Sequence, residues 1–497
     1  MPQIINTNIM SLNAQRNLNT SQNALKISLQ RLSSGLRINS ARDDAAGLAI
    51  VERFSSQIRG LSRAELNAND GVSLAQVAEG GLQEAGNILQ RVRELAVQSI
   101  NATNSSSDRQ SLNAEVSQLT AELERIARSS EFNGQKILDG TFGTAFFQVG
   151  ANANQTIVMS TGNFTTANYG DYRVLGYGST VASTTVSTST RATTGTLIIT
   201  SPLGIATIAT ANGQSAGTIA NNINLYTPTT GVEAFGETNA QLAFSSSGAY
   251  VFTMLSRNTT ASTLSFNLTA NTGVDALTSA STAINQFTAT TGVVAEVKSD
   301  GTAIILHSYT GDNIQLNATA YTNAGTVTMT GLDINGTVAG GTNTASLTSS
   351  AGTAGTMLVE GQVYFDSDKS FTVQSGLTFT GWVISAASEA SLLQQVANLD
   401  VSSVNAAKLA LTIADSALQQ ISSQRAKFGA LQSRFDSTIR NIQTSVENMS
   451  GARSRIQDAD FAVETAALSR AQILQQAGTA MLAQANTSQQ NVLSLLR

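Results

Sequence analysis

Apolar residues recur every three to four positions over long stretches near both ends of the chain. Between residues 74 and 95 the repeat is 3.5 residues, which is typical of a helix that buries one narrow seam. A second seam follows Ser107 and Asp108, which can cap a helix start, so the two seams predict a helical hairpin. The seams consist of Leu74, Ala78, Gly81, Ala85, Ile88, Val92 and Leu95, then Leu112, Val116, Leu119, Leu123 and Ile126.

A third seam runs from Leu411 to Met449. Pro2, Pro202 and Pro228 are the prolines of the chain, so neither flank contains this helix breaker beyond Pro2. At 1.5 Å per residue such a helix is on the order of 60 Å long, which predicts a rod. Its seam consists of Leu411, Ala414, Leu418, Ile421, Arg425, Phe428, Gln432, Phe435, Ile439, Ile442, Val446 and Met449.

The two ends of the chain form a separate pair of arms. No acidic residue precedes Asp43 or follows Glu464, and the polar faces consist mostly of Asn, Gln, Ser and Thr. A helix with a thin apolar stripe and few ion pairs is marginal alone, so we expect both arms to be disordered in the monomer and to fold on assembly. Their apolar seams consist of Leu18, Leu25, Leu29, Leu32 and Leu36, and of Leu474, Ala477, Met481, Ala485, Val492 and Leu495.

The middle of the chain has the pattern of β structure. Short alternating runs lie between Gly, Ser, Asn and Asp, and Asp300-Gly301 predicts a two-residue hairpin turn. Two similar stretches, INLYTPTTGVEA from Ile223 and INQFTATTGVVA from Ile284, start 61 residues apart and indicate two related small modules. The runs that predict strands are Thr196 to Thr200, Tyr250 to Leu255, Thr263 to Leu268 and Tyr364 to Val373.

Composition excludes several classes of function. Charged residues make up 12% of the 497 residues and the net charge is −5, so no broad basic surface for nucleic acid is expected. With no cysteine and only His307, metal sites and nucleophilic catalysis lack their usual groups, and we expect neither an enzyme nor a cofactor. Asp366 and Asp368 are interpreted as a solvated hairpin tip, and His307 as an ordinary strand residue.

The start of the chain lacks the basic and apolar regions of a signal peptide. No apolar run approaches the ~18 residues that a membrane span needs, so membrane insertion is not expected.

Both flanks contain long stretches of a distinctive sequence. On the N-terminal side these include IINTNIMSLNAQRNLN, LQRLSSGLRINSARDDAAGLAI and LQRVRELAVQSINATNSSSDR. On the C-terminal side they include FGALQSRFDSTI, ARSRIQDADFAVETAALSRAQILQQAGTAMLAQAN and the final VLSLLR. These stretches closely resemble bacterial flagellin, and the resemblance covers roughly the first 160 and the last 110 residues.

The resemblance implies an α+β multidomain fold, in which both termini form a long coiled-coil-like helical rod around an inserted β-rich outer region. The expected domains are terminal coiled-coil arms (1–42 and 458–497), a helical rod with a small β-hairpin (43–175 and 390–457), and a variable outer region (176–389) that contains the duplication. It also implies a homopolymer that forms the extracellular flagellar filament, exported through the flagellar type III apparatus without cleavage. An export chaperone, the filament cap and hook-filament junction proteins are the implied partners.

A further implication concerns host recognition. In family members sensed by the Toll-like flagellin receptor of animals, three residues make key contacts, and the matching positions are Arg91, Leu95 and Glu115. The alternative interpretation is that Leu95 packs in its seam and the charges form a solvated rim. Two other functions stay open, a hook-filament junction protein and a filament subunit with an adhesin-like outer domain, whereas a metalloprotease in the outer domain lacks ligands beyond His307.

Overall fold

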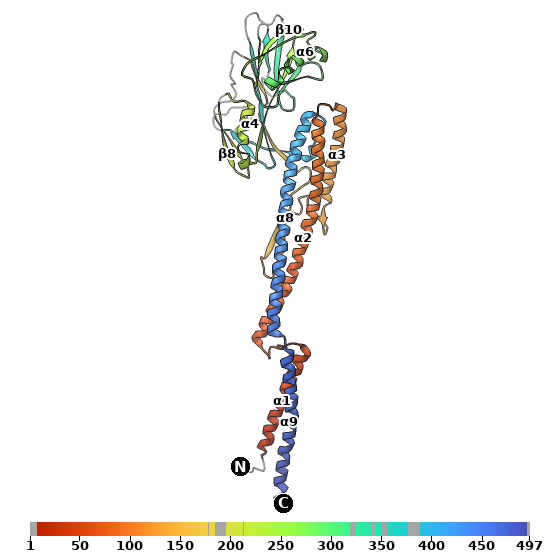
Figure 1. The fold of residues 1–497 in the computed structure, drawn as a ribbon, viewed down its shortest axis with the longest axis vertical. Coiled ribbons are helices and arrows are strands. Elements are labelled where there is room, and N and C mark those ends of the chain that lie inside the picture. The colour runs from red at the N-terminus through yellow and green to blue at the C-terminus, as the bar shows by residue number, and fades with distance from the viewer. Residues whose placement is uncertain are drawn as a thin grey trace. The chain divides into compact units, whose positions relative to one another are not determined.

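The computed structural model describes residues 7–176, 178–183, 195–211, 213–318, 325–338, 344–348, 355–375 and 388–494. The chain divides into two compact units. The first unit contains Met1–Gln76, Thr144–Ser160 and Gly429–Arg497, and the second contains Val77–Gly143 and Thr161–Phe428. Figure 1 shows the long helices, which come from both ends of the chain, and the strands of the middle region.

The long helices of both flanks confirm the predicted helical seams. None of the predicted seam positions between residues 74 and 126 or between 411 and 449 is exposed. The cap differs from the prediction, because Ser105 caps the helix with a reciprocal bond to Asp108, two residues before the expected position. The helices are α1 (Ile9–Ser34), α2 (Ala45–Ile100), α3 (Ser106–Ser129), α8 (Val404–Gln457) and α9 (Phe461–Ser494).

The middle region is β-rich, as predicted, but its described residues also form four short helices that the sequence pattern did not reveal. They are α4 (Ala216–Asn224), α5 (Thr227–Thr230), α6 (Val274–Asn285) and α7 (Thr288–Thr291). Two small hairpins, β1 (Glu131–Phe132) with β2 (Gln135–Lys136) and β3 (Thr144–Gln148) with β4 (Thr156–Ser160), come before this region. Its strands are β5 (Gly170–Leu175), β6 (Thr180–Ser183), β7 (Gly195–Thr200), β8 (Ile205–Thr210), β9 (Glu233–Phe244), β10 (Gly248–Leu255), β11 (Ser262–Leu268), β12 (Val294–Val297), β13 (Ile304–Ser308), β14 (Ile314–Ala318), β15 (Thr326–Leu332), β16 (Thr344–Thr348), β17 (Thr356–Glu360), β18 (Gln362–Ser367), β19 (Thr372–Ser375), β20 (Ser388–Ala390) and β21 (Leu392–Gln395).

The duplication seen in the sequence is a structural repeat. Asn224 ends α4 and exchanges two hydrogen bonds with the backbone of Ala234, at 2.8 and 2.7 Å, and Asn285 does the same with Ala295 at 2.8 Å. In both copies a four-residue helix ends at a glycine in the left-handed region, with φ of 66° in one and 74° in the other. The shared residues therefore build the same turn from helix to strand.

The repeat extends to whole modules. Module A consists of β7, β8, α4, α5, β9, β18 and β19, and module B consists of β10, β11, α6, α7, β12, β13 and β14. In module A the pairs are β7 with β8, β9 with β18 and β19 with β7. Module B repeats them as β10 with β11, β12 with β13 and β14 with β10. The same order of elements and the same pairs define one fold used twice.

Module B is inserted into module A. In module B a short turn joins β12 to β13, but in module A the equivalent strands β9 and β18 are separated by the whole of module B. The hydrophobic cores follow this division. One core cluster contains no residue between 238 and 361, and the other consists of residues in that interval together with Val181. Module A therefore has a core of its own, whereas the second core combines module B with the second half of β9 and with β6, β15, β16 and β17.

Two predictions in the middle region need correction. The run from Tyr364 to Val373 is not one strand, because β18 ends at Ser367 and β19 begins at Thr372. Asp366 is not solvated either, since it is 3% exposed and accepts hydrogen bonds of 2.6 and 2.7 Å from Arg173. Asp368 does lie in the intervening turn, beside Lys369.

Asp300-Gly301 forms the predicted hairpin, although the strands stop at Val297 and Ile304, so its turn is wider than two residues.

A second carboxyl group is buried beside the Arg173–Asp366 pair. The side chain of Asp171 is fully buried, its Oδ1 accepts a hydrogen bond of 2.9 Å from Ser416, and its Oδ2 lies 3.8 Å from Arg173 Nε without a hydrogen bond to any described residue. Burial, followed by repulsion from Asp366, raises the pKa of Asp171 to about 8. Two carboxyl groups thus share one guanidinium, and Asp171 holds a proton at neutral pH.

Replacing Asp171 by Asn is expected to stabilise the second unit at pH 8. The folded state holds a proton that the unfolded state releases, so this carboxyl lowers the stability progressively as the pH rises from about 4 to about 8. Asn cannot ionise and can still accept the Ser416 hydrogen bond. We expect Tm to rise by roughly 3 to 6 °C at pH 8, with little change near pH 4, in thermal unfolding followed by circular dichroism. The control is Asp275→Asn, which changes an exposed carboxyl group. An Asp171→Asn variant that is less stable than the unmodified chain at pH 8 would contradict the raised pKa of Asp171.

Candidate assembly surface

The terminal helices α1 and α9 pack side by side in antiparallel directions (Figure 1). Near the start of α1, Asn8 donates a hydrogen bond of 3.1 Å to the carbonyl oxygen of Ala485. Near its end, Arg31 lies 3.7 Å from Glu464 at the start of α9. Asn8 also caps α1 by accepting from Ser11 N, and Gly35 ends it in the left-handed region with φ of 71°. These contacts fix the register of the pair.

The face that α1 and α9 present to each other combines small residues with leucines. Ser11 and Ser28 of α1 are buried, and a Cβ placed on Gly478 of α9 would lie 3.3 Å from Leu18 Cδ1. Small side chains let the helices approach closely, so little apolar surface is covered. Among the described side chains, the buried and half-buried positions are Ser11, Ala14, Leu18, Ser21, Leu25, Ser28, Arg31 and Leu32 in α1, and Glu464, Thr465, Ala467, Leu468, Ala471, Gln475, Gly478, Leu482 and Ala485 in α9.

This packed face differs from the seams predicted for the arms. Leu18, Leu25 and Leu32 lie on it, but Leu29 is 49% exposed and Leu36 follows the end of α1, where it forms a bridge to Asp458. In α9, Leu474 and Met481 are 51% and 62% exposed. Val492 lies in α9, but its side chain is not among those described, and Leu495 lies outside the described residues. Of the predicted C-terminal seam, Ala485 therefore lies on the packed face, whereas Leu474 and Met481 lie at its edge.

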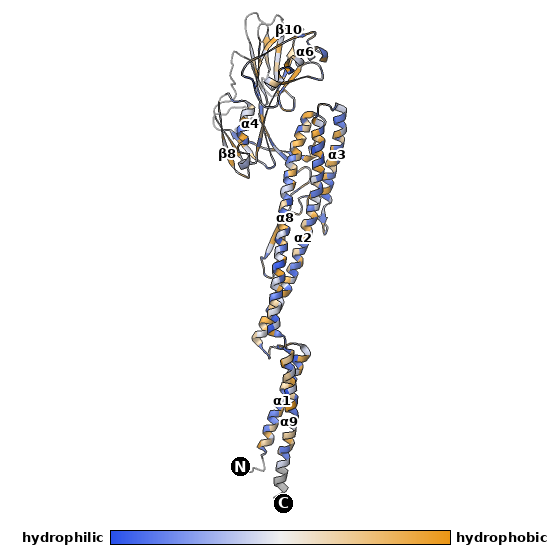
Figure 2. Ribbon diagram, in the orientation of Figure 1, coloured by the Kyte–Doolittle hydropathy of each residue, from blue (hydrophilic) through white to orange (hydrophobic). Residues whose placement is uncertain are grey.

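Large apolar side chains remain exposed along both helices, and Figure 2 shows apolar residues spread over their length. Their exposure ranges from 46% to 72%. Among the described side chains of α1 and α9, Ala471 is the one apolar residue that is buried. The exposed residues are Ile9, Met10, Leu12, Ile27 and Leu29 in α1, and Phe461, Val463, Ile473, Leu474 and Met481 in α9. Exposed apolar surface on this scale is typical of an interaction site.

A groove of about 540 Å³ runs between the two helices. Met10, Leu474 and Met481 supply its apolar surface, and Asn13, Asn17 and Gln484 its polar rim. The groove is open and contains side chains from both ends of the chain, so a binding partner would contact α1 and α9 together.

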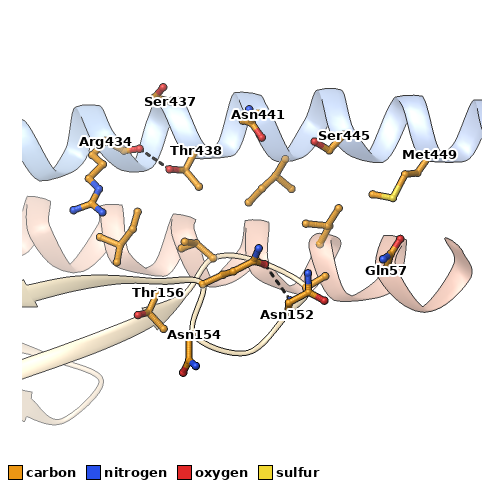
Figure 3. Close-up of a pocket in the computed structure, with 17 residues that line it drawn as sticks. Gln57, Asn152, Asn154, Thr156, Arg434, Ser437, Thr438, Asn441, Ser445 and Met449 are labelled. Carbon is orange, nitrogen blue, oxygen red and sulfur yellow. Dashed lines mark hydrogen bonds between the residues drawn. The ribbon is translucent and has the colours of Figure 1, made fainter. Parts of the chain in front are cut away.

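A second groove, of about 670 Å³, lies in the first unit beside the β3–β4 hairpin. Figure 3 shows polar side chains of α8 and of the hairpin loop around it, including Arg434, Asn441 and Asn152. Beneath the hairpin, Phe147 packs edge-on against Phe435 at 5.5 Å. A Cβ on Gly71 would lie 2.6 Å from that Phe435 ring, so α2 needs glycine there.

The other residues predicted from the sequence include both exposed and buried side chains. Arg91 and Glu115 are exposed and form an ion pair of 2.9 Å, which raises the pKa of Arg91. Leu95 is 1% exposed and packs in the α2 seam. His307 lies in β13, where its Nδ1 is 2.7 Å from Asn239 Oδ1. The described residues contain no group of three His, Cys, Asp or Glu that could hold a metal ion.

Comparison with known proteins places these helices in a family. Residues 5–143 match the bacterial flagellin N-terminal helical region, and residues 411–496 match the bacterial flagellin C-terminal helical region. The whole chain is 42% identical over 500 residues to the B-type flagellin of Pseudomonas aeruginosa, with complete coverage of both proteins. The chain belongs to the bacterial flagellin family. It is also 36% identical over 522 residues to the flagellin of Salmonella typhimurium, again over all of both proteins.

Membership of the flagellin family makes the chain a structural subunit that polymerises into the flagellar filament. The solved structure of FliC from Burkholderia pseudomallei matches 73% of this flagellin and 99% of that chain, at 22% identity and a TM-score of 0.29. Within the described ranges, no helix of this flagellin has the length and hydropathy needed to cross a bilayer.

Proposed function

We propose that α1 and α9 are the polymerisation arms of this flagellin and that neighbouring copies cover their exposed apolar side chains. The observation that carries the proposal is the contrast on these two helices between ten large apolar residues at 46% to 72% exposure and one buried apolar residue, Ala471. Leu18, Leu25 and Leu32 hold α1 against α9, whereas Leu29, Leu474 and Met481 are available to other copies. We expect Leu36, Val492 and Leu495 to contribute to the same contacts between copies.

The energetics favour arms that order on assembly. Covering one large apolar side chain contributes about 1.5–3 kcal/mol, and the α1–α9 pair leaves most of that contribution unused. An isolated helix pair with few ion pairs is marginally stable in water. Neighbouring subunits therefore supply the free energy that fixes both helices, which are disordered in the monomer.

The geometry also supports an open polymer. α1 and α9 expose different side chains, so the surface that a subunit offers on one helix is unlike that on the other. Head-to-tail contacts between unlike surfaces build a helical filament when the rotation between copies does not close. The polar groove beside β3–β4 is a second surface available for such contacts.

Removing residues 474–497 tests this proposal. The truncated chain loses Leu474, Met481 and one wall of the groove between α1 and α9, so it is expected to stay soluble and monomeric. Electron microscopy and sedimentation under conditions in which the full-length chain polymerises provide the measurement. The control is a full-length chain in which exposed Leu225 and Ile205 of the middle region are replaced by Ala. Filaments of normal length from the truncated chain would contradict the role of the arms.

The remaining partners are part of the same proposal. An export chaperone holds the C-terminal arm before assembly, the chain leaves the cell through the flagellar type III apparatus without cleavage, and cap and hook-filament junction proteins meet the filament at its ends. Recognition by the animal Toll-like flagellin receptor stays a prediction. Its exposed residues are Arg91 and Glu115, and buried Leu95 supports them by packing within the seam.

A further inference from the structure

A cleft of about 520 Å³ lies in the second unit, where the first turns of α8 meet β9 and β18. A smaller cavity shares Glu237, Tyr364, Lys408 and Thr412 with it, so the two form one recess. A volume in this range is typical of pockets for small molecules. The polymerisation arms contribute no residue to its lining.

Two aromatic surfaces line this cleft. Phe235 stacks on Tyr364 with ring centroids 5.4 Å apart, and the guanidinium of Arg173 lies 5.0 Å from the centre of the Tyr364 ring. On another wall Tyr309 is 53% exposed and stacks on His307 at 5.6 Å, nearly parallel. Neighbouring side chains thus hold each exposed ring in a fixed orientation before any ligand arrives.

The polar groups of the cleft carry balanced charge. Lys408 Nζ lies 3.5 Å from Glu237 Oε1 and 4.1 Å from the centre of the Tyr309 ring. Burial, and then the charge of Lys408, lower the pKa of His307 to about 4, so the imidazole is neutral at pH 7. The side-chain amides of Asn221, Asn335 and Asn405 line the recess and make no hydrogen bond within the described part of the chain.

The internal duplication shows that the fold of module A does not require these residues. Ala234 pairs with Phe365 in module A as Ala295 pairs with Leu306 in module B, which makes the positions of the two modules equivalent. By this register, Phe235 corresponds to Glu296, Tyr364 to Ile305 and Asn221 to Thr282. Module B folds with none of the three, so this combination of side chains is a property of the cleft and not of the module.

We propose that this cleft binds a neutral saccharide. An aromatic ring packs well against the apolar face of a pyranose, and free amides with one carboxylate and one ammonium can bond its hydroxyl groups. The balanced pair of Glu237 and Lys408 favours an uncharged ligand over a polyanion. The size of the recess suits one or two sugar rings.

Saturation-transfer difference NMR on the full-length chain tests the proposal. The probes are N-acetylglucosamine, N-acetylgalactosamine, galactose and mannose, each at about 10 mM because single sugars bind in the millimolar range. N-acetylneuraminic acid is the charged comparator. We expect transfer to at least one neutral sugar, and Phe235→Ala or Tyr309→Ala should weaken that binding about tenfold.

Two controls separate the cleft from general aromatic contact. Tyr226→Ala removes a ring that is 40% exposed in module A but is absent from the lining, and it should leave binding unchanged. Asn405→Ala, on α8, tests the polar side without disturbing either aromatic wall, and it should also weaken binding. The proposal would be overturned if no neutral sugar showed transfer or if the charged sugar bound more tightly than the neutral ones. It would also be overturned if the Tyr309→Ala and Asn405→Ala variants bound the sugar as tightly as the unmodified chain.

Discussion

The double substitution of Leu474 and Met481 by Lys is expected to abolish polymerisation while the monomer keeps its folded units. Both side chains are more than half exposed in the single chain, so lysine there should change the free energy of unfolding by no more than about 0.5 kcal/mol. The proposed function places the same positions under other copies in a filament, and there two unpaired ammonium groups would cost several kcal/mol. Electron microscopy and sedimentation after addition of filament seeds measure the loss.

The matched control introduces two lysines in the middle region instead of in α9. Leu225 and Ile205 of the middle region are 76% and 65% exposed, so changing both to Lys adds equal charge outside the arms. This control should polymerise at the wild-type critical concentration. If the Leu474→Lys, Met481→Lys chain polymerised as readily as the control, the exposed face of α9 would not be a contact between subunits.

Excision of module B is expected to leave a folded module A and a chain that still polymerises. Glu237 and Gln362 are partners across β9 and β18, and the equivalent residues of module B, Lys298 and Ala303, are joined by a hydrogen bond of 3.0 Å. Residues 238–361 can therefore be replaced by Ser-Asp-Gly-Thr, the turn that joins Lys298 to Ala303. Circular dichroism and electron microscopy measure the folding and the polymerisation of this shortened chain.

The physical basis of this expectation is the separation of the two cores. The core cluster of module A contains no residue from the excised interval. The remaining part of the chain loses the pairing of β6 with β17 and the core that buries Val181. It also loses hydrogen bonds of 3.1 Å from Gly217 to Gly311 and from Ile334 to the side chain of Gln362. A chain that joins Glu237 directly to Gln362 lacks room for the turn and serves as the negative control. Loss of cooperative unfolding in the chain with the grafted turn would show that module A depends on module B.

Much of the fold could be predicted because helical packing leaves a strong periodic pattern. The seams of α2, α3 and α8 consist largely of Leu, Ile, Val and Phe, and these residues are buried or half-buried as expected. The duplication was visible because a helix end that turns into a strand needs particular residues. Asn224 and Gly231 satisfy that need in one copy, and Asn285 and Gly292 in the other.

The packed face of the arms could be predicted only in part from the size of apolar residues. Close approach of α1 and α9 places Ser28, Ala471 and Gly478 inside the pair, whereas larger residues such as Leu474 remain more than half exposed. A search that follows Leu and Met therefore finds the leucines of the packed face in α1 but selects exposed residues in α9.

Other features depend on residues distant in the sequence. Asp366 has the local pattern of a turn, and its partner Arg173 lies 193 positions away, so spacing could not indicate the buried pair. The cleft could not be predicted for the same reason, because it combines Phe235, Tyr309 and Lys408 from separate elements. The α4 to α7 helices were missed because they are rich in Thr, Ser and Asn, which gives a weak helical pattern.

The composition of the arms also determines how association responds to temperature and salt. The described helices α1 and α9 carry Arg16, Lys26, Arg31, Glu464 and Arg470 as their charged residues, so association covers mostly uncharged surface. Such burial has a negative heat-capacity change, and the attraction between subunits weakens on cooling. Ionic strength acts chiefly on charged groups and has little to screen here. We therefore expect a filament joined through these helices to depend little on salt concentration and to weaken on cooling.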